Sequence, residues 1–559
     1  MWWKENAIYQ IYPRSFNDSN GDGIGDIRGI IEKLDYLKDL GVGIVWLSPV
    51  YESPGDDNGY DISHYQRIMP EFGTLADMDE LIAGLHTRGI KLLMDLVVNH
   101  TSDEHEWFQA SRKSKDSRYR DYYIWRPNID GTPPNNWASV FGGSAWTLDE
   151  ATNEWYLHLF SKKQPDLNWE NKAVRHEIHE MMRWWLDRGV DGFRMDVINM
   201  ISKEPGLPDA PVTSDNKYHL DISLITHGPR LEEFLLEIKD KVLSGHDAMT
   251  VGEMPAVSTA QAQRITDEVN GSLSMVFHFE HVDLDIAPGA SSKFEVGPLH
   301  LTELKQVLSK WQNDLDTAGW NSIYLSNHDQ PRSVSRFGDD GQYHAESAKM
   351  LATLTHLQKG TPYIYQGEEI GMTNIPMSHI DEYRDIESIN LYKEWVEEKG
   401  KSTEETLAAI YQKGRDNSRT PFQWNGSRQA GFTSGEPWIK VNPNHKTINA
   451  AAASADPDSI LNYYKQLIQL RKDRPIVTYG RFDLILAEHE SIFAFTRTFG
   501  EEKLLVLLNF SAETARFKLP KEIKFKCKEV LLANYSQPEN KDFADHILRP
   551  YEACVYLGI

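Results

Sequence analysis

Three carboxylates, each at the end of its own apolar run, are the residues of this sequence best suited to chemistry. Asp196 closes Gly-Phe-Arg-Met-Asp, Glu253 closes Met-Thr-Val-Gly-Glu, and Asp329 closes Tyr-Leu-Ser-Asn-His-Asp. Short buried strands that end in functional residues are how a (β/α)₈ barrel brings catalytic groups to one face. Two opposed carboxyl groups, a nucleophile and a proton donor, can hydrolyse a glycosidic bond with retention of configuration. The three acids therefore predict a glycosidase.

Two of the apolar runs carry further polar residues. Arg194 precedes Asp196 by two residues, so strand alternation puts both on one face, where the guanidinium favours an ionised carboxylate. An ordinary Arg–Asp ion pair is the alternative. In the run that ends Asp95-Leu-Val-Val-Asn-His100, Asp95 is expected to point inward. It is either part of the site or a buried structural acid. His100 is expected to reach the mouth, where a neutral imidazole can donate to a sugar hydroxyl.

The elements that must position these residues form a repeating pattern. Segments with helical periodicity lie between most of the apolar runs, most clearly Arg230–Leu243, whose Leu231, Phe234, Leu235, Ile238 and Val242 share one face. Apolar strands that alternate with helices predict a covered parallel sheet, and eight of them predict a closed (β/α)₈ TIM barrel. The eight runs are Ala7–Phe16, Ile44–Tyr51, Lys91–His100, Gly192–Val197, Met249–Met254, Ser274–His281, Asn321–Asp329 and Thr361–Glu369.

Two long gaps and the C-terminal part depart from this pattern. The stretch Thr101–Asn171, after the third run, predicts a small inserted domain over the barrel mouth, and Met372–Asn449 is a second excursion. After Val477, the runs Ser491–Phe499, Lys503–Phe510 and Tyr551–Ile559 predict an antiparallel β-domain. We expect the barrel at 1–104 and 174–478, the inserted domain B at 105–173, and a C-terminal β-sandwich domain at 479–559.

The composition limits the partners and the compartment. Lys+Arg 59 against Asp+Glu 83 gives a net charge of −24, which disfavours nucleic acid and anionic lipid and suits a neutral substrate. The start lacks an apolar stretch of signal-peptide length, and no run of about 20 apolar residues occurs. We expect a cytoplasmic monomer that acts on a small oligosaccharide. Cys527 and Cys554 are expected to be buried thiols, with a single disulfide as the alternative.

Together, the segments around Asp95–His100, Arg194–Asp196, Glu253 and His328–Asp329 resemble the four signature regions of the α-amylase superfamily of glycoside hydrolases. The resemblance covers the whole chain and is strongest to the oligo-1,6-glucosidase and α-glucosidase subgroup. It implies that Asp196 is the nucleophile, Glu253 the general acid/base, and Asp329 the acid that holds the glucosyl hydroxyls. No organic cofactor is implied.

The resemblance also implies a set of substrate-binding residues. Asp57 and Tyr60 of Asp-Asn-Gly-Tyr would hold the non-reducing end, with Tyr60 stacked under the sugar ring, and Arg415 would pair with Asp57 to close the pocket. A closed end implies an exo-acting enzyme. Plain packing or surface exposure is the alternative for each residue of the aglycone side. The glucose site would be completed by His100, Arg194 and His328, and the aglycone side would be formed by Phe141, Phe160, Gln164 and Glu387.

A cation loop follows the first apolar run. Asp18-Ser-Asn-Gly-Asp-Gly-Ile-Gly-Asp26 offers an oxygen ligand at every second residue, and its glycines allow tight turns. Its twelfth position is Gly29, which excludes a true EF-hand. The resemblance implies a structural Ca²⁺, or Mg²⁺, and a plain turn-forming loop is the alternative. The implied ligands are Asp18, Asn20, Asp22, the Ile24 carbonyl and Asp26.

Val197, directly after Asp196, carries the expected linkage preference. In the resembling subgroup, Val here is typical of α-1,6-acting enzymes, and Thr or Ala of those that accept α-1,4 bonds, because a β-branched apolar side chain narrows the +1 site. The alternative for Val197 is packing among the barrel side chains. A maltase-type α-1,4-glucosidase and a sucrose isomerase or transglucosylase stay open as alternatives for the activity. Gln330–Phe337 lacks the Arg/Asp-rich segment of sucrose isomerases, which favours hydrolysis.

Overall fold

The computed structural model describes residues 1–212, 215–290, 292–535 and 543–559. Its centre is a sheet of eight parallel strands in the order β11-β10-β9-β5-β2-β1-β13-β12. A parallel bridge between Val276 and Asn321 joins the two outer strands, so that the sheet closes into a barrel. The strands are β1 (Ile8–Ile11), β2 (Ile44–Leu47), β5 (Lys91–Val97), β9 (Gly192–Asp196), β10 (Met249–Glu253), β11 (Met275–Phe277), β12 (Ser322–Ile323) and β13 (Thr361–Tyr365).

Each predicted apolar run contains one barrel strand, but the strands are shorter than predicted. The difference is largest at β12, which ends at Ile323, so that Asp329 lies in a turn and not at a strand end. Tyr324 and Leu325 stay buried beyond the hydrogen-bonded ladder. Apolar character therefore reports burial, and burial continues past the end of the strand.

Strand alternation separates the barrel interior from the layer beneath the helices. On β1, Ile8 belongs to the interior cluster, whereas Tyr9 and Ile11 pack outward. Trp46 on β2 and Phe277 on β11 fill the interior with bulky rings. At the C-terminal ends of the strands the interior becomes polar, and this is where the predicted acids lie.

Helices cover the outside of the barrel. The segment predicted as a helix at Arg230–Leu243 forms α8 (Leu231–Ile238) and continues as the π-helix η4 (Lys239–Leu243), with Arg230 as N-cap. All five residues of its predicted face are buried. Other outer helices include α4 (Leu75–Thr87), α6 (Lys172–Asp187), α10 (Leu301–Asp314), α12 (His344–Leu357) and α17 (Ile460–Asp473). No helix of the described ranges is both long and apolar enough to span a membrane.

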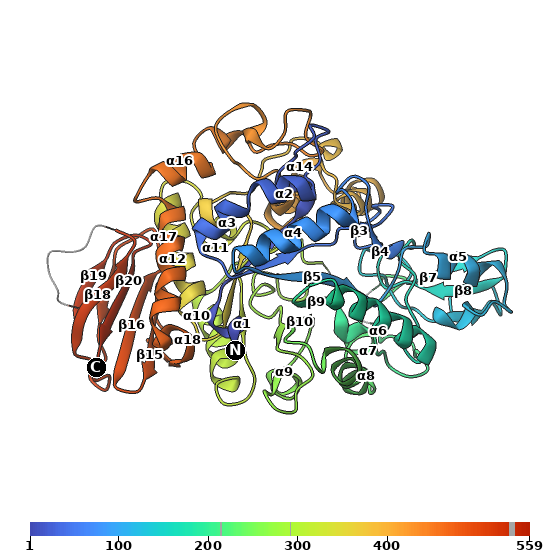
Figure 1. Ribbon diagram of the computed structural model, residues 1–559, viewed down its shortest axis with the longest axis horizontal. Helices are drawn as coiled ribbons and strands as arrows, with labels where there is room; N and C mark the ends of the chain where they lie inside the picture. Colours follow the sequence, from blue (N-terminus) through green and yellow to red (C-terminus); the bar gives the residue numbers. More distant parts are fainter. Residues whose placement is uncertain (213–214, 291, 536–542) are drawn as a thin grey trace.

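The chain between β5 and α6 forms a small inserted unit with its own sheet. It contains α5 (Glu106–Lys113) and the antiparallel strands β6 (Trp125–Pro127), β8 (Glu154–Leu157) and β7 (Trp146–Asp149), paired in that order. This unit and the C-terminal strands lie at opposite ends of the molecule (Figure 1). The barrel therefore separates the two smaller parts.

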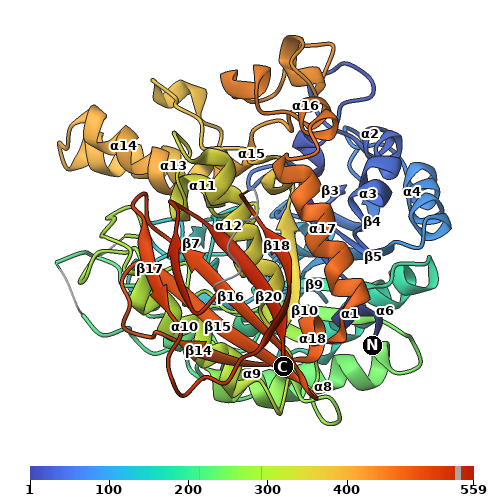
Figure 2. The same ribbon diagram turned by 90° about the vertical axis from the view of Figure 1, so that its left-hand side faces the viewer.

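The segment after β13 supplies loops and helices to the barrel mouth. It includes α13 (Ile386–Tyr392), α14 (Thr403–Lys413) and the short helix α15 (Asp416–Arg419). The C-terminal part forms the antiparallel sheet β14-β15-β16-β20-β18, which faces the viewer in Figure 2, and the two-stranded antiparallel sheet β17-β19. Its strands are β14 (Arg481–Ile485), β15 (Ile492–Phe499), β16 (Glu502–Asn509), β17 (Ala515–Lys518), β18 (Cys527–Ala533), β19 (Asp545–Leu548) and β20 (Ala553–Gly558).

Candidate active site

Asp196 and Glu253 lie side by side because their strands are neighbours. They are the last residues of β9 and β10, which pair in parallel, so both side chains leave the same edge of the sheet. Arg194 on β9 stands opposite Asp95 on the other neighbour, β5. The polar residues of three adjacent strands thus converge at the barrel mouth.

One buried guanidinium holds three carboxylates together. Nη1 of Arg194 donates to Oδ1 of Asp196 at 2.5 Å and to Oδ1 of Asp95 at 2.8 Å. Its Nη2 lies 2.7 Å from Oε2 of Glu253. The Arg194 side chain is 1% exposed, so this charge is not shared with solvent. The prediction that Arg194 and Asp196 share a face is confirmed. Asp196 and Glu253 also contact the same guanidinium.

Burial controls the protonation of these acids. It raises the pKa of Asp196 to about 7, although Arg194 opposes the shift, and it raises the pKa of Glu253 to about 7 against the same opposition. The general acid/base role that the resemblance implies for Glu253 requires such a raised pKa. Arg194 acts on Asp196 in the expected direction, since it lowers the pKa of this carboxyl, but burial outweighs it. A site with one shared proton can hold one acid ionised and the other protonated.

Asp95 is a buried structural acid, as one of its two interpretations held. Besides Arg194, it accepts hydrogen bonds from Nε1 of Trp46 at 3.1 Å and from the Tyr60 hydroxyl at 3.0 Å. Burial raises its pKa to about 6. It positions Arg194 and Tyr60 and is not itself exposed to the mouth.

Val197 has a left-handed backbone, with φ 34° and ψ 41°. This conformation is uncommon for a β-branched residue and marks local strain. It turns the Val197 N–H toward Glu253, whose Oε2 accepts at 3.0 Å. The Val197 side chain packs in a cluster with Trp137, Leu157 and Leu159 of the inserted unit. It therefore lies at the mouth and not among the side chains that fill the barrel.

A second group of charges surrounds Asp329 in the turn after β12. Its Oδ1 accepts from Nη2 of Arg419 at 2.8 Å and from Nη1 of Arg415 at 3.2 Å. Its Oδ2 lies 3.1 Å from Nε2 of His328. Burial opposes ionisation here as well, but His328 and the two arginines outweigh it and hold the pKa of Asp329 well below its usual range.

Arg415 closes one end of the pocket. The predicted pair with Asp57 is present, at 3.3 Å from Nη2 to Oδ1. A shorter bond, 2.6 Å, joins the same nitrogen to Oδ1 of Asp385, which sequence reasoning missed. Asp385 is fully buried, and despite this burial the arginines lower its pKa. The sequence could have indicated Asp385, because an Asp two residues before the predicted Glu387 is a suitable helix N-cap, and Asp385 is the N-cap of α13.

Residues of the inserted unit reach the closed end as well as the opening. The amide of Gln164 donates to Oδ2 of Asp57 at 3.1 Å and lies 3.3 Å from Nε2 of His100. The prediction had Gln164 on the aglycone side, so it is wrong; the turn Ser161–Gln164 folds back under Asp57. Burial lowers the pKa of His100 to about 4, so its imidazole is neutral as expected.

Tyr60 and the phenylalanines line the pocket. Tyr60 stacks on His328 with ring centroids 5.1 Å apart and planes 6° apart, so one of its faces is covered by protein. Phe160 packs against His100 at 5.1 Å and against Phe141 at 5.5 Å. Phe141 in turn lies 5.1 Å from the guanidinium of Arg415. These rings join the closed end to the opening.

Glu387 lies at the opening. Its Oε2 bonds Nζ of Lys293 at 2.6 Å and lies 3.6 Å from Nε of Arg415. Phe141 and Glu387 line a groove of about 610 Å³ between the inserted unit and α13. Lys293 was not predicted. This groove is where the part of a substrate beyond the first sugar would leave the pocket.

The predicted cation residues lie in one tight loop. Asp18 accepts from the backbone N–H groups of Asn20, Gly21 and Gly23, and Asp26 accepts from Ser19 and caps α2 (Ile27–Glu32) at Gly29. Gly23 has φ 92°, and a Cβ there would meet the Glu436 carbonyl at 1.8 Å. The oxygen donors suit a hard cation. The three carboxylates do not all lie within 4.8 Å of one another, so they would turn inward to hold an ion.

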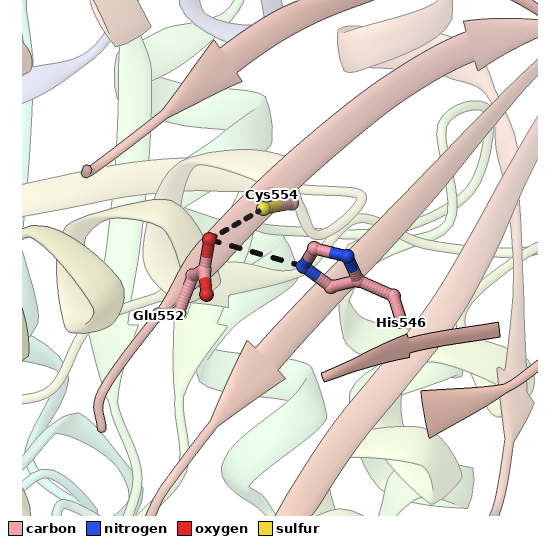
Figure 3. Close-up of side chains that lie close together, drawn as sticks. All are labelled: His546, Glu552 and Cys554. Carbon is pink, nitrogen blue, oxygen red and sulfur yellow. Dashed lines mark hydrogen bonds and ion pairs between the residues drawn. The ribbon is translucent and has the colours of Figure 1, made fainter. Parts of the chain in front are cut away.

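In the described part of the chain, only one group brings three potential metal-ligand side chains within that distance. It lies in the C-terminal β-domain and consists of His546 on β19, Glu552, and Cys554 on β20 (Figure 3). Arg549 already binds Glu552 bidentately, at 2.7 Å from Nη2 and 3.1 Å from Nε. His546 and Arg549 together outweigh burial and lower the pKa of Glu552 to about 2. Arg549 therefore balances the charge of Glu552 in place of a metal ion, and we interpret this group as structural.

The two cysteines are thiols. Cys554 is buried, as predicted, whereas Cys527 is only half-buried.

Comparisons with known proteins agree with this geometry. Residues 10–480 match the family described as "Alpha amylase, catalytic domain", and residues 492–555 match "Alpha-amylase SusG C-terminal domain". The chain is 61% identical to the oligo-1,6-glucosidase of Parageobacillus thermoglucosidasius and 60% identical to that of Bacillus cereus, each over 100% of this chain and 99% of the relative. The isomaltulose synthase of Klebsiella sp. LX3 superposes with a TM-score of 0.96 at 43% identity, over 100% of both chains.

The sequence match spans the barrel, and the fold of the solved relative covers the whole chain. The carboxylates around Arg194 lie where a glycosidase of this fold requires them, at the C-terminal ends of the strands. The chain is a glycoside hydrolase and belongs to the α-amylase family.

Proposed function

We propose that this hydrolase is a retaining, exo-acting oligo-1,6-glucosidase, which releases glucose from the non-reducing end of short α-1,6-linked glucosides. The observation that carries the proposal is the pair Asp196 and Glu253 on the two terminal nitrogens of Arg194. Retaining hydrolysis needs two carboxyl groups roughly 5–5.5 Å apart, and one guanidinium spanning both keeps them adjacent. Two relatives that are 61% and 60% identical to this chain are named oligo-1,6-glucosidases, which supports the same activity.

In this proposal, protonated Glu253 gives its proton to the glycosidic oxygen while ionised Asp196 attacks the anomeric carbon. The resulting glucosyl ester on Asp196 is then hydrolysed by a water that Glu253 deprotonates, so both groups return to their starting state. Asp329, held ionised by its arginines, accepts hydrogen bonds from the glucosyl hydroxyls. These bonds strengthen as the ring approaches the oxocarbenium-like transition state.

The closed end supports exo action. Asp57, Arg415 and Asp385 form a fully buried group, so the pocket has no exit beyond the first sugar on this side. A substrate would enter through the groove beside Glu387 and Phe141 and place only its terminal glucose inside.

We also propose that the loop between β1 and α2 binds a divalent cation. Asp18, Asn20, Asp22, the Ile24 carbonyl and Asp26 would hold a Ca²⁺ or Mg²⁺, which would supply stability to the loop. We infer a cytoplasmic monomer from the composition.

The linkage preference can be tested at Val197. An α-1,6 bond adds a methylene that lets the second ring swing clear of this side chain, whereas an α-1,4 bond does not. A misfit of one methyl group corresponds to roughly 10–200-fold discrimination. We expect the wild type to prefer isomaltose to maltose, and Val197→Thr or Val197→Ala to raise activity on maltose relative to isomaltose.

The measurement is kcat/KM on isomaltose, maltose, sucrose and trehalose-6-phosphate, each tested separately with product analysis. A wild type that prefers maltose would refute the α-1,6 assignment and leave the α-glucosidase assignment standing. Formation of a new disaccharide from sucrose would favour the isomerase alternative.

A further inference from the structure

Gln10 lies beneath the candidate active site and reaches it through His328. It is two residues after Ile8 on β1, so strand alternation turns it toward the barrel interior, and it is 1% exposed. Its amide nitrogen lies 2.8 Å from Nδ1 of His328 and donates to the Ser48 hydroxyl at 3.1 Å. The side chain therefore joins the first two barrel strands to the turn that carries Asp329.

This contact decides which nitrogen of His328 carries the proton. An amide nitrogen only donates, so Nδ1 must accept and the neutral ring carries its proton on Nε2. Nε2 is the nitrogen 3.1 Å from Oδ2 of Asp329. It is buried and makes no other hydrogen bond with the protein, so its one polar neighbour is Asp329.

The ring cannot easily turn to exchange its two nitrogens. Tyr60 stacks on one face of His328, and Tyr12 lies parallel to it at 6.2 Å and 19°. Trp46 meets its edge at 5.9 Å and 85°. With these rings in place, the donor at Nδ1 and the Asp329 carboxylate at Nε2 both favour the Nε2–H tautomer.

The charges that face His328 also favour a neutral ring. Burial lowers its pKa; Asp329 opposes this, while Arg194 and Arg419 act with burial. Gln10 adds no charge and blocks protonation at Nδ1. An acidic side chain at this position would reverse both effects.

We propose that Gln10 is a positioning residue for glycoside hydrolysis, which holds His328 as its neutral Nε2–H tautomer so that this N–H faces Asp329 and the glucosyl hydroxyls. The proposal rests on the function proposed above. Because bonds to those hydroxyls strengthen in the transition state, loss of Gln10 lowers kcat more than it raises KM.

The central test is a double-mutant cycle on a nitrophenyl α-glucoside. Gln10→Met keeps the volume and removes the donor, and we expect kcat to fall about tenfold with KM nearly unchanged. If Gln10 acts through His328, the double variant Gln10→Met with His328→Asn is no slower than His328→Asn alone. If Gln10→Met lowers kcat by the same factor in the His328→Asn background as in the wild type, the proposal is wrong. Ser48→Ala, which removes only the other partner of the amide, is the matched control and should leave kcat within about twofold.

Gln10→Glu gives a readout that a purely structural role would not produce. The ionised carboxylate of this variant accepts from Nδ1–H and leaves Nε2 without its proton. At lower pH, either the introduced carboxylate regains a proton and donates to Nδ1, or His328 becomes doubly protonated. We therefore expect the ratio of the variant's kcat to the wild type's to rise as pH falls. A ratio independent of pH would contradict the proposal, even if Gln10→Met fails to fold.

The tautomer itself can be observed without turnover. In protein labelled with ¹⁵N-histidine, the His328 signals are assigned by their loss in His328→Asn. We expect the Nε2–H shift pattern in the wild type and a changed pattern in Gln10→Glu. An Nδ1–H pattern in the wild type would refute the role of Gln10. A wild type that shows the Nε2–H pattern but cleaves no α-glucoside would instead refute the proposed function.

Discussion

Two groups of carboxylates lie at the barrel mouth and differ in how many arginines they meet. In the Arg194 cluster, one guanidinium serves Asp95, Asp196 and Glu253. In the Arg415–Arg419 cluster, two guanidinium groups serve Asp329 and Asp385, and Arg415 also reaches Asp57 at 3.3 Å.

The pKa shifts of the two groups have opposite directions. Burial raises the pKa of every acid in the Arg194 cluster, to about 6 or 7. Burial acts on the second cluster too, yet His328 and the arginines lower the pKa of Asp329, and the arginines lower that of Asp385. The pKa of Asp57, which lies 3.3 Å from Arg415, is raised to about 7 by burial, like those of the acids around Arg194. The first cluster thus keeps a proton available for chemistry, whereas Asp329 in the second is an ionised acceptor for sugar hydroxyls.

The largest expected effect comes from removing the reactive acids of the Arg194 cluster. We expect Asp196→Asn and Glu253→Gln each to lower kcat by at least about a thousandfold with folding intact, since both keep the side-chain volume. Glu253→Gln should partly recover on a nitrophenyl glucoside, whose leaving group needs no proton, and Asp196→Asn should not. The exposed Glu232→Gln serves as control. Equal loss on both substrates would overturn the assignment of the two roles.

The second cluster should respond in binding and orientation. Asp385→Asn removes the closest partner of Arg415 without changing volume, so Arg415 is freed to move toward Asp57 and Asp329. Loss of a charged hydrogen bond corresponds to roughly ten- to hundredfold in kcat/KM. The measurement is kcat/KM on isomaltose, with exposed Asp381→Asn as control. An unchanged value would show that the two clusters do not differ through their arginines.

Neutral substitutions in the two clusters should change the free energy of unfolding at neutral to alkaline pH in opposite directions. Folded Glu253 keeps its proton to about pH 7, whereas the unfolded chain loses it near its ordinary pKa of 4.5. Ionisation therefore costs stability as pH rises through this interval. Glu253→Gln should raise the free energy of unfolding at pH 8 by up to about 3 kcal/mol, with the gain vanishing near pH 4.

Asp329→Asn should behave in the reverse way. The folded-state pKa of Asp329 is lowered, so its contribution is present above the unfolded pKa and is lost as pH falls through the folded one. This variant should be less stable than the wild type at neutral pH and approach it in acid. Denaturant unfolding of both variants across pH tests the pair, and shifts of the same sign would contradict the comparison.

The cation loop gives the smallest expected effect on activity. Among the ion pairs of the described residues, none includes Asp18, Asp22 or Asp26, so these acids would be balanced by a divalent ion instead of arginine. Chelation should lower the thermal midpoint by a few degrees, restored by Ca²⁺, and leave activity at moderate temperature nearly unchanged. Full, Ca²⁺-reversible inactivation without unfolding would mean that the ion acts in the active site.

Local spacing was sufficient for much of this molecule. The eight apolar runs predict the eight barrel strands, because burial on both sides of a parallel sheet demands continuous apolar sequence. Asp196 and Glu253 end their strands as expected, and Arg194 shares a face with Asp196 because side chains alternate with a period of two. These features depend on residues within a few positions of one another, so the sequence by itself determined them.

Tertiary structure decided the rest, for a physical reason. Asp57 and Arg415, whose pairing only the family resemblance implied, are 358 residues apart. Asp385 joins them through a loop that no periodicity describes, and Gln164 reaches the closed end because its turn folds back. How many buried carboxylates share Arg194 depends on the packing of three strands, β5, β9 and β10. Such counts arise only when distant loops pack together, and spacing along the chain does not record them.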